Sequence, residues 1–346
     1  MSRGLLTIDL GAIVRNWQKL CAIHAAGAVA GVVKANAYGL GVGPVATALR
    51  DAGCRHFFVA QPREGIALRK VLGPEPMIAV LGGFPDAQRH GVTPVLNSLD
   101  ALRAYRGPAI LQVDTGMSRL GLDASELESL ARDPSPFDGV ELLYVMTHLA
   151  AADDPGHPLN AVQADRFAEA CLKLPRARRS FANSSGIFLG GRYASDLARP
   201  GCALYGINPT PGKPNPMEPV VRLEAPVLQL RSIAAGQTVG YGGTWMATRP
   251  SRIATIPAGY ADGLPRAIDG KAKGAIRGRP VPMVGRVSMD LITLDVTDVP
   301  EAAAGDLVEL IGPSQDADAL ARICGSIGYE ILTSLGNRYE RRYLPA

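Results

Sequence analysis

The segment 28–41 (AVAGVVKANAYGLG) places Lys34 directly after an apolar run and before a turn that contains glycine. Lysine is almost never fully buried unless it is paired or functional. If the apolar run is a strand of a parallel barrel, Lys34 lies at the end of the barrel where active sites form, and loss of water there lowers the pKa of its amine. Such an amine suits a Schiff base with a carbonyl substrate or with pyridoxal phosphate. A rim lysine that only reaches solvent is the alternative. We expect Tyr38, one helical turn further on, to contact the same ligand.

The elements that must position Lys34 are predicted by an alternation of short apolar runs and helical stretches. Strands that alternate with helices at this spacing indicate a parallel sheet. The expected strands are 5–8, 28–33, 56–60, 77–81, 93–96, 109–113, 140–146 and 179–182, and the expected helices lie near 45–52, 64–71, 99–105, 126–132 and 160–174. About seven or eight such strands precede residue 210, so we favour an eight-stranded barrel over an open doubly wound sheet. No glycine-rich dinucleotide fingerprint follows the first strand, which also argues against a Rossmann domain.

The pattern changes after the proline-rich segment 209–216, which we take as the domain boundary. Short strands separated by Gly and Pro then predict a β domain. The fold class we expect is α/β, a (β/α)8 TIM-type barrel followed by a mainly β C-terminal domain. The expected domains are residues 9–218 for the barrel and 219–346 for the β-rich domain, with residues 1–8 as an N-terminal strand that can join the C-terminal domain.

Length and composition agree with two folded domains and exclude several classes of protein. The chain has 346 residues, a formal net charge of +4, 47% hydrophobic residues and 20% charged residues. The charge is too small to indicate nucleic acid or a membrane surface as a partner, and the hydrophobic content is too high for a disordered chain. The five cysteines are widely spaced without a CxxC pair, so we expect neither a disulfide framework nor a metal site. With no signal peptide and no apolar run of ~18 residues, we expect a cytoplasmic protein.

Nine motifs along the chain resemble those of alanine racemases, in the order that the family has them. They are VVKANAYGLG (32–41), VDTGMSRLG (113–121), THLA (147–150), ANSS (182–185), ARPGCALYG (198–206), VGYGGTW (239–245), AGYADGLPR (258–266), VGRVSMD (284–290) and GYEILTSLGNRYERRY (328–343). The lysine motif by itself is shared with other fold-type III pyridoxal-phosphate proteins. The ordered set is much more specific, and it covers almost the whole chain.

The resemblance implies a two-base racemisation with pyridoxal phosphate bound to Lys34. Lys34 is the base on the D-alanine face, and Tyr241 is the base on the opposite face. Two bases let a proton leave one side of Cα and return to the other. The phenol has an ordinary pKa near 10 and needs nearby cations to act as a base. The resemblance puts Arg119 and His148 in that surrounding.

The resemblance also implies the other site residues. The residues that bind the cofactor are Lys34, Tyr38, His148, Asn183, Ser184, Arg199, Gly201, Cys202 and Tyr329. The residues that bind the substrate are Arg119, Met289, which offers a backbone N–H to the carboxylate, and Tyr260, which narrows the access. No metal is implied. Family members complete each site with the partner's tyrosine and methionine, so the resemblance implies a homodimer with shared active sites.

Arg199 has a specific implied role against the pyridine nitrogen of the cofactor. An arginine is always protonated and can only donate, so it keeps that nitrogen unprotonated. We therefore expect little leakage into transamination.

One position departs from the family. Many members have a carbamylated lysine that supports the arginine matching Arg119, and this chain has Gln112 there. Either the Gln112 side chain accepts directly from Arg119, or a bound chloride takes the place of the carbamate. We favour chloride, because Gln112 alone leaves Arg119 without a negative partner.

The expected function is thus interconversion of L- and D-alanine, supplying D-alanine for peptidoglycan. A broad-specificity amino-acid racemase is an alternative within the same reaction class. A non-catalytic pyridoxal-phosphate-binding protein is another, but it would not need Tyr241 or the β domain. A fold-type III decarboxylase is a third, although such enzymes generally place an acidic residue where this chain has Arg199.

Overall fold

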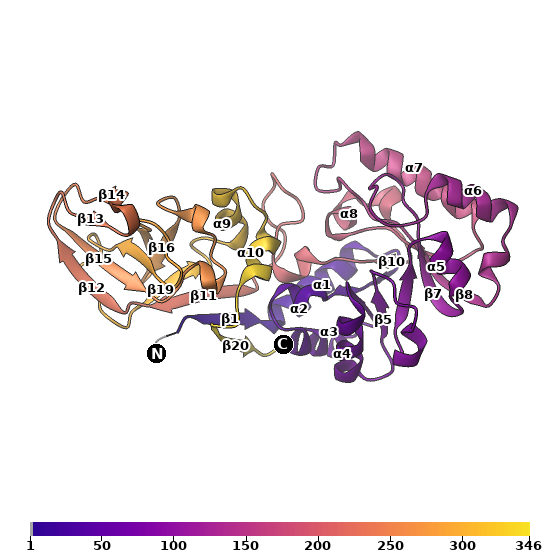
Figure 1. Ribbon diagram of the computed structural model, residues 1–346, viewed down its shortest axis with the longest axis horizontal. Coiled ribbons are helices and arrows are strands. Elements are labelled where there is room, and N and C mark those ends of the chain that lie inside the picture. Colours follow the sequence, from indigo (N-terminus) through magenta and orange to yellow (C-terminus); the bar gives the residue numbers. More distant parts are fainter. Residues whose placement is uncertain (1–2) are drawn as a thin grey trace. The chain divides into compact units, whose positions relative to one another are not determined.

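The structure of the chain is a computed structural model that describes residues 3–346. The chain divides into two compact units (Figure 1). One contains Ile13–Glu218. The other contains Pro219–Ala346 together with the N-terminal segment up to Ala12. Between residues 3 and 346, no helix is long and apolar enough to cross a membrane.

The Ile13–Glu218 unit is built around a parallel sheet that closes on itself. Its strands are β2 (Ala28–Val29), β3 (Gly31–Val32), β4 (His56–Val59), β5 (Met77–Val80), β6 (Thr93–Leu96), β7 (Gly107–Gln112), β8 (Val140–Met146), β9 (Arg178–Ser180) and β10 (Leu197–Ala198). The sheet runs from β2 through β10 and back down to β3. Since β2 and β3 are separated only by Ala30, they are two halves of one strand, and the nine segments form an eight-stranded barrel. The expected fold class is confirmed. The eighth barrel strand, however, is β10, which the sequence did not predict, and the expected strand 5–8 pairs in the sheet of the other unit.

Helices alternate with these strands. They are α1 (Leu10–Ile23), α3 (Val42–Asp51), α4 (Pro62–Leu72), α5 (Leu99–Ala104), α6 (Ala124–Arg132), α7 (Pro158–Lys173) and α8 (Ser184–Leu189). A side chain at the start of most of them accepts a backbone N–H, as Asp9 does from Ala12 and Asp123 from Glu126. These caps fix where each helix leaves the rim of the barrel.

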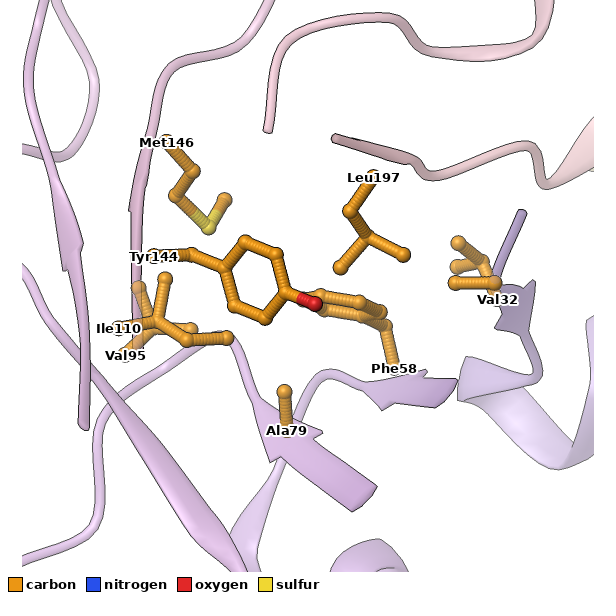
Figure 2. Close-up of a cluster of buried hydrophobic side chains, with 9 residues drawn as sticks. Val32, Phe58, Ala79, Val95, Ile110, Tyr144, Met146 and Leu197 are labelled. Carbon is orange, nitrogen blue, oxygen red and sulfur yellow. The ribbon is translucent and has the colours of Figure 1, made fainter. Parts of the chain in front are cut away.

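The barrel interior is filled with side chains, so the barrel is a packed core and not a pore. A cluster of buried residues comes from nearly every strand: Ala30, Val32, Phe58, Ala79, Val95, Ile110, Tyr144, Met146 and Leu197. Figure 2 shows the Tyr144 ring reaching inward toward Phe58. The register sets Ile110 beside Tyr144 on adjacent strands. Polar chemistry is therefore confined to the ends of the strands.

The other unit is mainly β. Its strands are β1 (Leu5–Asp9), β11 (Val221–Pro226), β12 (Gln229–Ile233), β13 (Thr238–Val239), β14 (Trp245–Met246), β15 (Ser251–Ile256), β16 (Lys273–Ile276), β17 (Arg279–Pro282), β18 (Ile292–Asp295), β19 (Leu307–Ile311) and β20 (Glu340–Leu344). A six-stranded sheet has the order β17-β16-β19-β11-β1-β20, so the first strand of the chain pairs with β11 and β20. The helices α9 (Ala317–Cys324) and α10 (Gly328–Ser334) complete the unit.

Candidate active site

Lys34 is separated from the end of β3 by one residue, at the carboxyl end of the first barrel strand. Its side chain is half-buried. Burial lowers the pKa of the Lys34 amine, the Arg119 guanidinium lowers it further, and the Glu64 carboxylate raises it. The Lys34 amine is therefore neutral in a larger fraction of molecules than the amine of a lysine in water. The neutral amine is the form that acts as a nucleophile or a base.

The backbone after Lys34 has a left-handed conformation, which L-residues rarely adopt. The φ angles of Ala35, Asn36, Ala37 and Tyr38 lie between 52° and 55°, so α2 (Lys34–Tyr38) is a left-handed turn. The expectation that Tyr38 lies on an ordinary helix is wrong. Left-handed helical geometry costs roughly 1–2 kcal/mol per residue, so neighbouring groups must hold this turn in place. One such contact joins the Asn36 side-chain oxygen to the Val42 N–H at 2.8 Å.

Tyr38, Ser184 and Gly201 meet at one edge of the barrel. A β-carbon on Gly201 would lie 2.2 Å from the Tyr38 hydroxyl oxygen, so only glycine fits there. The Ser184 hydroxyl accepts the backbone N–H groups of Gly201 and Ala203 at 3.0 and 3.3 Å. Asn183 caps α8 beside them by accepting the Gly186 N–H at 2.9 Å. Hydroxyls and loop N–H groups at this end of a barrel form a cradle suited to a phosphate.

Arg199 follows β10 and is buried, with 5% of its surface exposed. It donates to the Ser180 hydroxyl through Nη1 and to the Thr147 carbonyl through Nη2. Within residues 3–346 its Nε–H donates to no protein acceptor, so one edge of the guanidinium is open to a ligand. Burial lowers the pKa of Arg199 to about 10, which still leaves it a cation at neutral pH. This geometry fits an acceptor such as a pyridine nitrogen.

His148 stands among the cations of the site. Burial, together with the nearby cations Arg199, Arg119 and Lys34, lowers its pKa to about 3. The ring is therefore a neutral imidazole at neutral pH. Arg119 acts on the charge of Lys34, and Arg199, Arg119 and Lys34 act on that of His148, so the structure brings these four side chains near one another.

A buried glutamine that the sequence analysis missed fixes the loop of His148. Gln163 on α7 accepts the Ala150 N–H at 2.8 Å and donates to the His148 carbonyl at 2.9 Å and to the Thr115 hydroxyl at 3.1 Å. Thr115 is hydrogen-bonded to Thr147 at 2.8 Å. Gln163 thereby links the loop after β7, which carries Arg119, to the loop after β8. Nothing in the sequence marks it, because its partners are two backbone groups and a threonine hydroxyl that only folding brings close.

The structure decides one of the two alternatives for the group that supports Arg119, the direct hydrogen bond to Gln112. Gln112 is buried and its side-chain nitrogen donates to the Leu120 carbonyl at 3.0 Å. Within residues 3–346, the guanidinium of Arg119 makes neither a hydrogen bond nor an ion pair with the protein. A direct acceptor role for Gln112 toward Arg119 is therefore wrong.

The other expected site residues lie in the mainly β unit. Tyr241, Tyr260 and Met289 line a cavity of about 500 Å³, together with Arg266, Val287, Ser288 and Asp290. Tyr241 and Met289 are strongly exposed, at 69% and 53% of their surface. Within the described residues the backbone N–H of Met289 donates to no protein acceptor, so it is available to a ligand. Tyr329, also in this unit, lies at the start of α10.

Arg338, which the sequence analysis also missed, ties two walls of this cavity together. Its Nη1 lies 2.8 Å from Asp290, next to Met289, and its Nε lies 3.2 Å from Asp262, in the turn that starts at Tyr260. Burial raises the pKa of Asp262 and Arg338 opposes that shift, while the carboxylate also accepts the Gly259 N–H at 2.9 Å. The basic residue and the two acidic ones are close only because three loops fold together.

These features define a parallel-barrel protein with a lysine of lowered pKa at the end of a strand, hydroxyl and backbone N–H groups at the same edge of the barrel, and a second, mainly β unit. Two family models match the chain, the alanine racemase N-terminal domain over residues 8–209 and the alanine racemase C-terminal domain over residues 220–343. The chain belongs to the alanine racemase family.

Individual relatives are similar over most of their lengths. The alanine racemase of Acidiphilium cryptum is 53% identical, over 99% of both chains. The catabolic alanine racemase of Mesorhizobium japonicum is 52% identical, over 98% of this chain and 93% of its own. The crystal structure of the alanine racemase from Bartonella henselae with covalently bound pyridoxal phosphate has a TM-score of 0.95 and 45% identity, and the match covers 99% of this chain and 100% of that chain.

Proposed function

We propose that this chain interconverts L- and D-alanine with pyridoxal phosphate bound to Lys34. The observation that carries the proposal is the Lys34 amine at the end of β3, with its pKa lowered by burial and by Arg119. The Bartonella henselae relative, with its covalently bound pyridoxal phosphate, supports the choice of cofactor. The open Nε–H of Arg199 and the cradle of Tyr38, Ser184 and Gly201 support it independently.

The cofactor's ring and phosphate would be held by different residues. Arg199 would donate to the pyridine nitrogen, and neutral His148 would contact the ring. The phosphate would be bound by Tyr38, Ser184, Tyr329 and the backbone N–H groups of Gly201 and Cys202, with Asn183 contributing to the same group. When bound, pyridoxal phosphate withdraws electrons from Cα and so stabilises the carbanion that racemisation requires.

The chain's own side chains then move the proton. Lys34 takes or returns it at Cα on the D-alanine face, and Tyr241 does so on the opposite face. Arg119 and the Met289 N–H hold the substrate carboxylate. Tyr260 narrows the cavity of about 500 Å³ that it lines with Tyr241 and favours a small side chain.

We propose a homodimer in which the Tyr241 cavity of one subunit completes the Lys34 site of the other. The exposure of Tyr241 and Met289 in the single chain supports this arrangement, because large side chains at an assembled site are normally covered. In this proposal a chloride ion near Gln112 is the negatively charged partner of the Arg119 guanidinium. A cytoplasmic location stays a prediction from the sequence.

The proposed physiological role is supply of D-alanine for peptidoglycan. Relatives include both an alanine racemase and a catabolic alanine racemase at similar identity. The role is tested by whether loss of the gene makes growth depend on D-alanine.

The reaction is tested by deuterium exchange at Cα with L-alanine, D-alanine and L-serine. We expect exchange and racemisation of both alanines, and loss of exchange and of the cofactor's visible absorbance in Lys34→Ala. If Lys34→Ala retains both the deuterium exchange and the visible absorbance, the proposal is refuted. A wild-type protein that binds the cofactor but exchanges no deuterium would be the non-catalytic carrier instead. Comparable rates with L-serine would indicate the broad-specificity racemase.

A further inference from the structure

Glu64, on α4, makes an unusual set of contacts close to Lys34. One carboxylate oxygen accepts the N–H of Ala35, the residue directly after the lysine, at 2.6 Å. The other accepts the N–H groups of Ala60 and Gln61 at 2.8 and 2.9 Å. A single half-buried side chain thus joins the end of β4 and the start of α4 to the turn that carries the lysine.

A hydrogen bond to the Ala35 N–H has the most effect on the orientation of Lys34. Ala35 is the first of the four consecutive left-handed residues, so its peptide sets the direction in which the turn leaves Lys34. A charge-assisted hydrogen bond is stronger than one between neutral groups. Because α4 packs on the barrel, the hydrogen bond from Glu64 restricts movement of the lysine turn relative to the barrel strands.

We propose that Glu64 is a positioning residue that holds the left-handed turn and thereby orients the Lys34 amine toward the cofactor's aldehyde carbon. The proposal rests on the proposed function, since it concerns the reactivity of Lys34 toward pyridoxal phosphate. Glu64 touches neither the substrate nor the cofactor in this role. It acts through the backbone of residue 35.

The charges around Lys34 support a second effect of the same side chain. The charged or titratable groups that face the amine are Arg119 from the loop after β7, His148 from the loop after β8, and Glu64 from α4. Glu64 is the acidic group among these three, and it raises the pKa of the amine against the effect of Arg119. Removal of its charge should therefore lower the pKa of Lys34.

Helix capping is the alternative explanation of Glu64, and the chain contains a matched control for it. Glu64 forms a capping box with Gln61 at the start of α4. Glu126 forms a capping box with Asp123 at the start of α6 and also accepts the Leu99 N–H from a neighbouring element at 2.8 Å. Glu126 therefore has the same capping geometry and the same kind of cross-element bond, without contact to the lysine turn.

The test compares Glu64→Ala and Glu64→Gln with Glu126→Ala and Glu126→Gln in the full-length protein. The cofactor is removed with hydroxylamine and pyridoxal phosphate is added back. The rate of attachment to Lys34 is followed by visible absorbance and by borohydride trapping across a range of pH. Thermal unfolding is measured in parallel.

We expect Glu64→Ala to slow attachment by roughly tenfold to a hundredfold, the loss typical of one charge-assisted hydrogen bond. Glu126→Ala should stay within about twofold of wild type while losing a similar amount of stability. Glu64→Gln keeps an oxygen for Ala35 but loses the charge. It should regain part of the rate and move the pH dependence of attachment to lower pH, whereas Glu126→Gln should leave that dependence unchanged.

Equal rates in the Glu64 and Glu126 variants, or no pH shift in Glu64→Gln, would overturn the inference. The Gln variant keeps the test valid if Glu64→Ala does not fold. Failure of the wild-type protein to attach the cofactor would instead refute the proposed function, so the two failures are distinguishable.

Discussion

The Tyr38 hydroxyl occupies the space that a side chain on Gly201 would need. A β-carbon on residue 201 would lie 2.2 Å from the hydroxyl oxygen and 3.0 Å from the ring carbon that bears it. The tyrosine has little freedom to move away, because its ring packs on Tyr205 with centroids 4.7 Å apart and its backbone belongs to the left-handed turn.

Replacement of Gly201 by alanine should therefore damage cofactor binding more than folding. We expect Gly201→Ala to weaken pyridoxal-phosphate affinity by roughly tenfold or more, the cost of displacing one hydrogen-bonding group from a preorganised cradle. Fluorescence or absorbance titration measures the affinity. Gly43→Ala is the control, since no atom lies within 4 Å of its added carbon. Equal affinity in the two variants would show that Tyr38 does not constrain the cradle.

His148 should make the fold sensitive to acid. Burial lowers its pKa from an ordinary value of 6.5 to about 3, so between these values the unfolded chain binds a proton that the folded chain does not. The free energy of unfolding then falls as the pH is lowered through this range. His24 and His56, whose pKa values are also lowered by burial, act in the same direction.

The His148→Gln variant should thus lose stability less steeply between pH 6.5 and about pH 3, the window that the two pKa values define. Urea unfolding at several pH values gives the slope. The exposed His90, replaced by glutamine, provides the control. An unchanged slope in His148→Gln would mean that the imidazole is not held neutral by burial.

Gln163 should be costly to replace by an apolar residue of similar size. Gln163→Leu leaves the Ala150 N–H, the His148 carbonyl and the Thr115 hydroxyl without this partner. We expect a loss of about 2–4 kcal/mol in the free energy of unfolding, measured by chemical denaturation. Glu169→Leu, an exposed change on the same helix, should cost much less. A loss below about 1 kcal/mol would indicate that water replaces the missing bonds.

Shared active sites predict complementation between two inactive variants. Lys34→Ala and Tyr241→Phe should each be inactive alone. In a mixed dimer with shared sites, one site carries both changes and the other carries neither. Unfolding and refolding the two together should restore activity to about a quarter of wild type, as expected for random pairing in a two-fold dimer. If each chain used its own Lys34 and Tyr241, every site would carry a defect and no activity would return.

The catalytic activity should depend on a small anion bound beside Arg119. The Arg119 guanidinium has no protein partner within residues 3–346, and Gln112 donates to the Leu120 carbonyl instead. Replacing chloride by gluconate at constant ionic strength should lower kcat/KM by about two- to fivefold, the effect of one partly screened charge pair. Gln112→Glu should remove the dependence. Activity that does not respond to chloride in the wild type would reject the ion.

The sequence by itself predicted the architecture and most of the candidate site. Lys34 was found from its place after an apolar strand, because burial of a lysine is costly enough to need a reason. The barrel followed from the alternation of strands and helices, which reflects local periodicity. Met289 and Tyr241 followed from the resemblance alone, since a strand methionine or tyrosine has no local signal of chemistry.

Only the tertiary structure decided how those residues are held. Local propensity predicts a right-handed helix after Lys34, whereas the structure has a left-handed turn there, whose Ala35 N–H is bound by Glu64 from another helix. Gln163 binds backbone groups and a threonine hydroxyl, and Arg338 binds two carboxylates, all distant in the chain, so neither residue has a sequence signature. Periodicity and residue type are local properties that the sequence carries, whereas strain, burial and the pKa of a side chain depend on groups that only folding brings together.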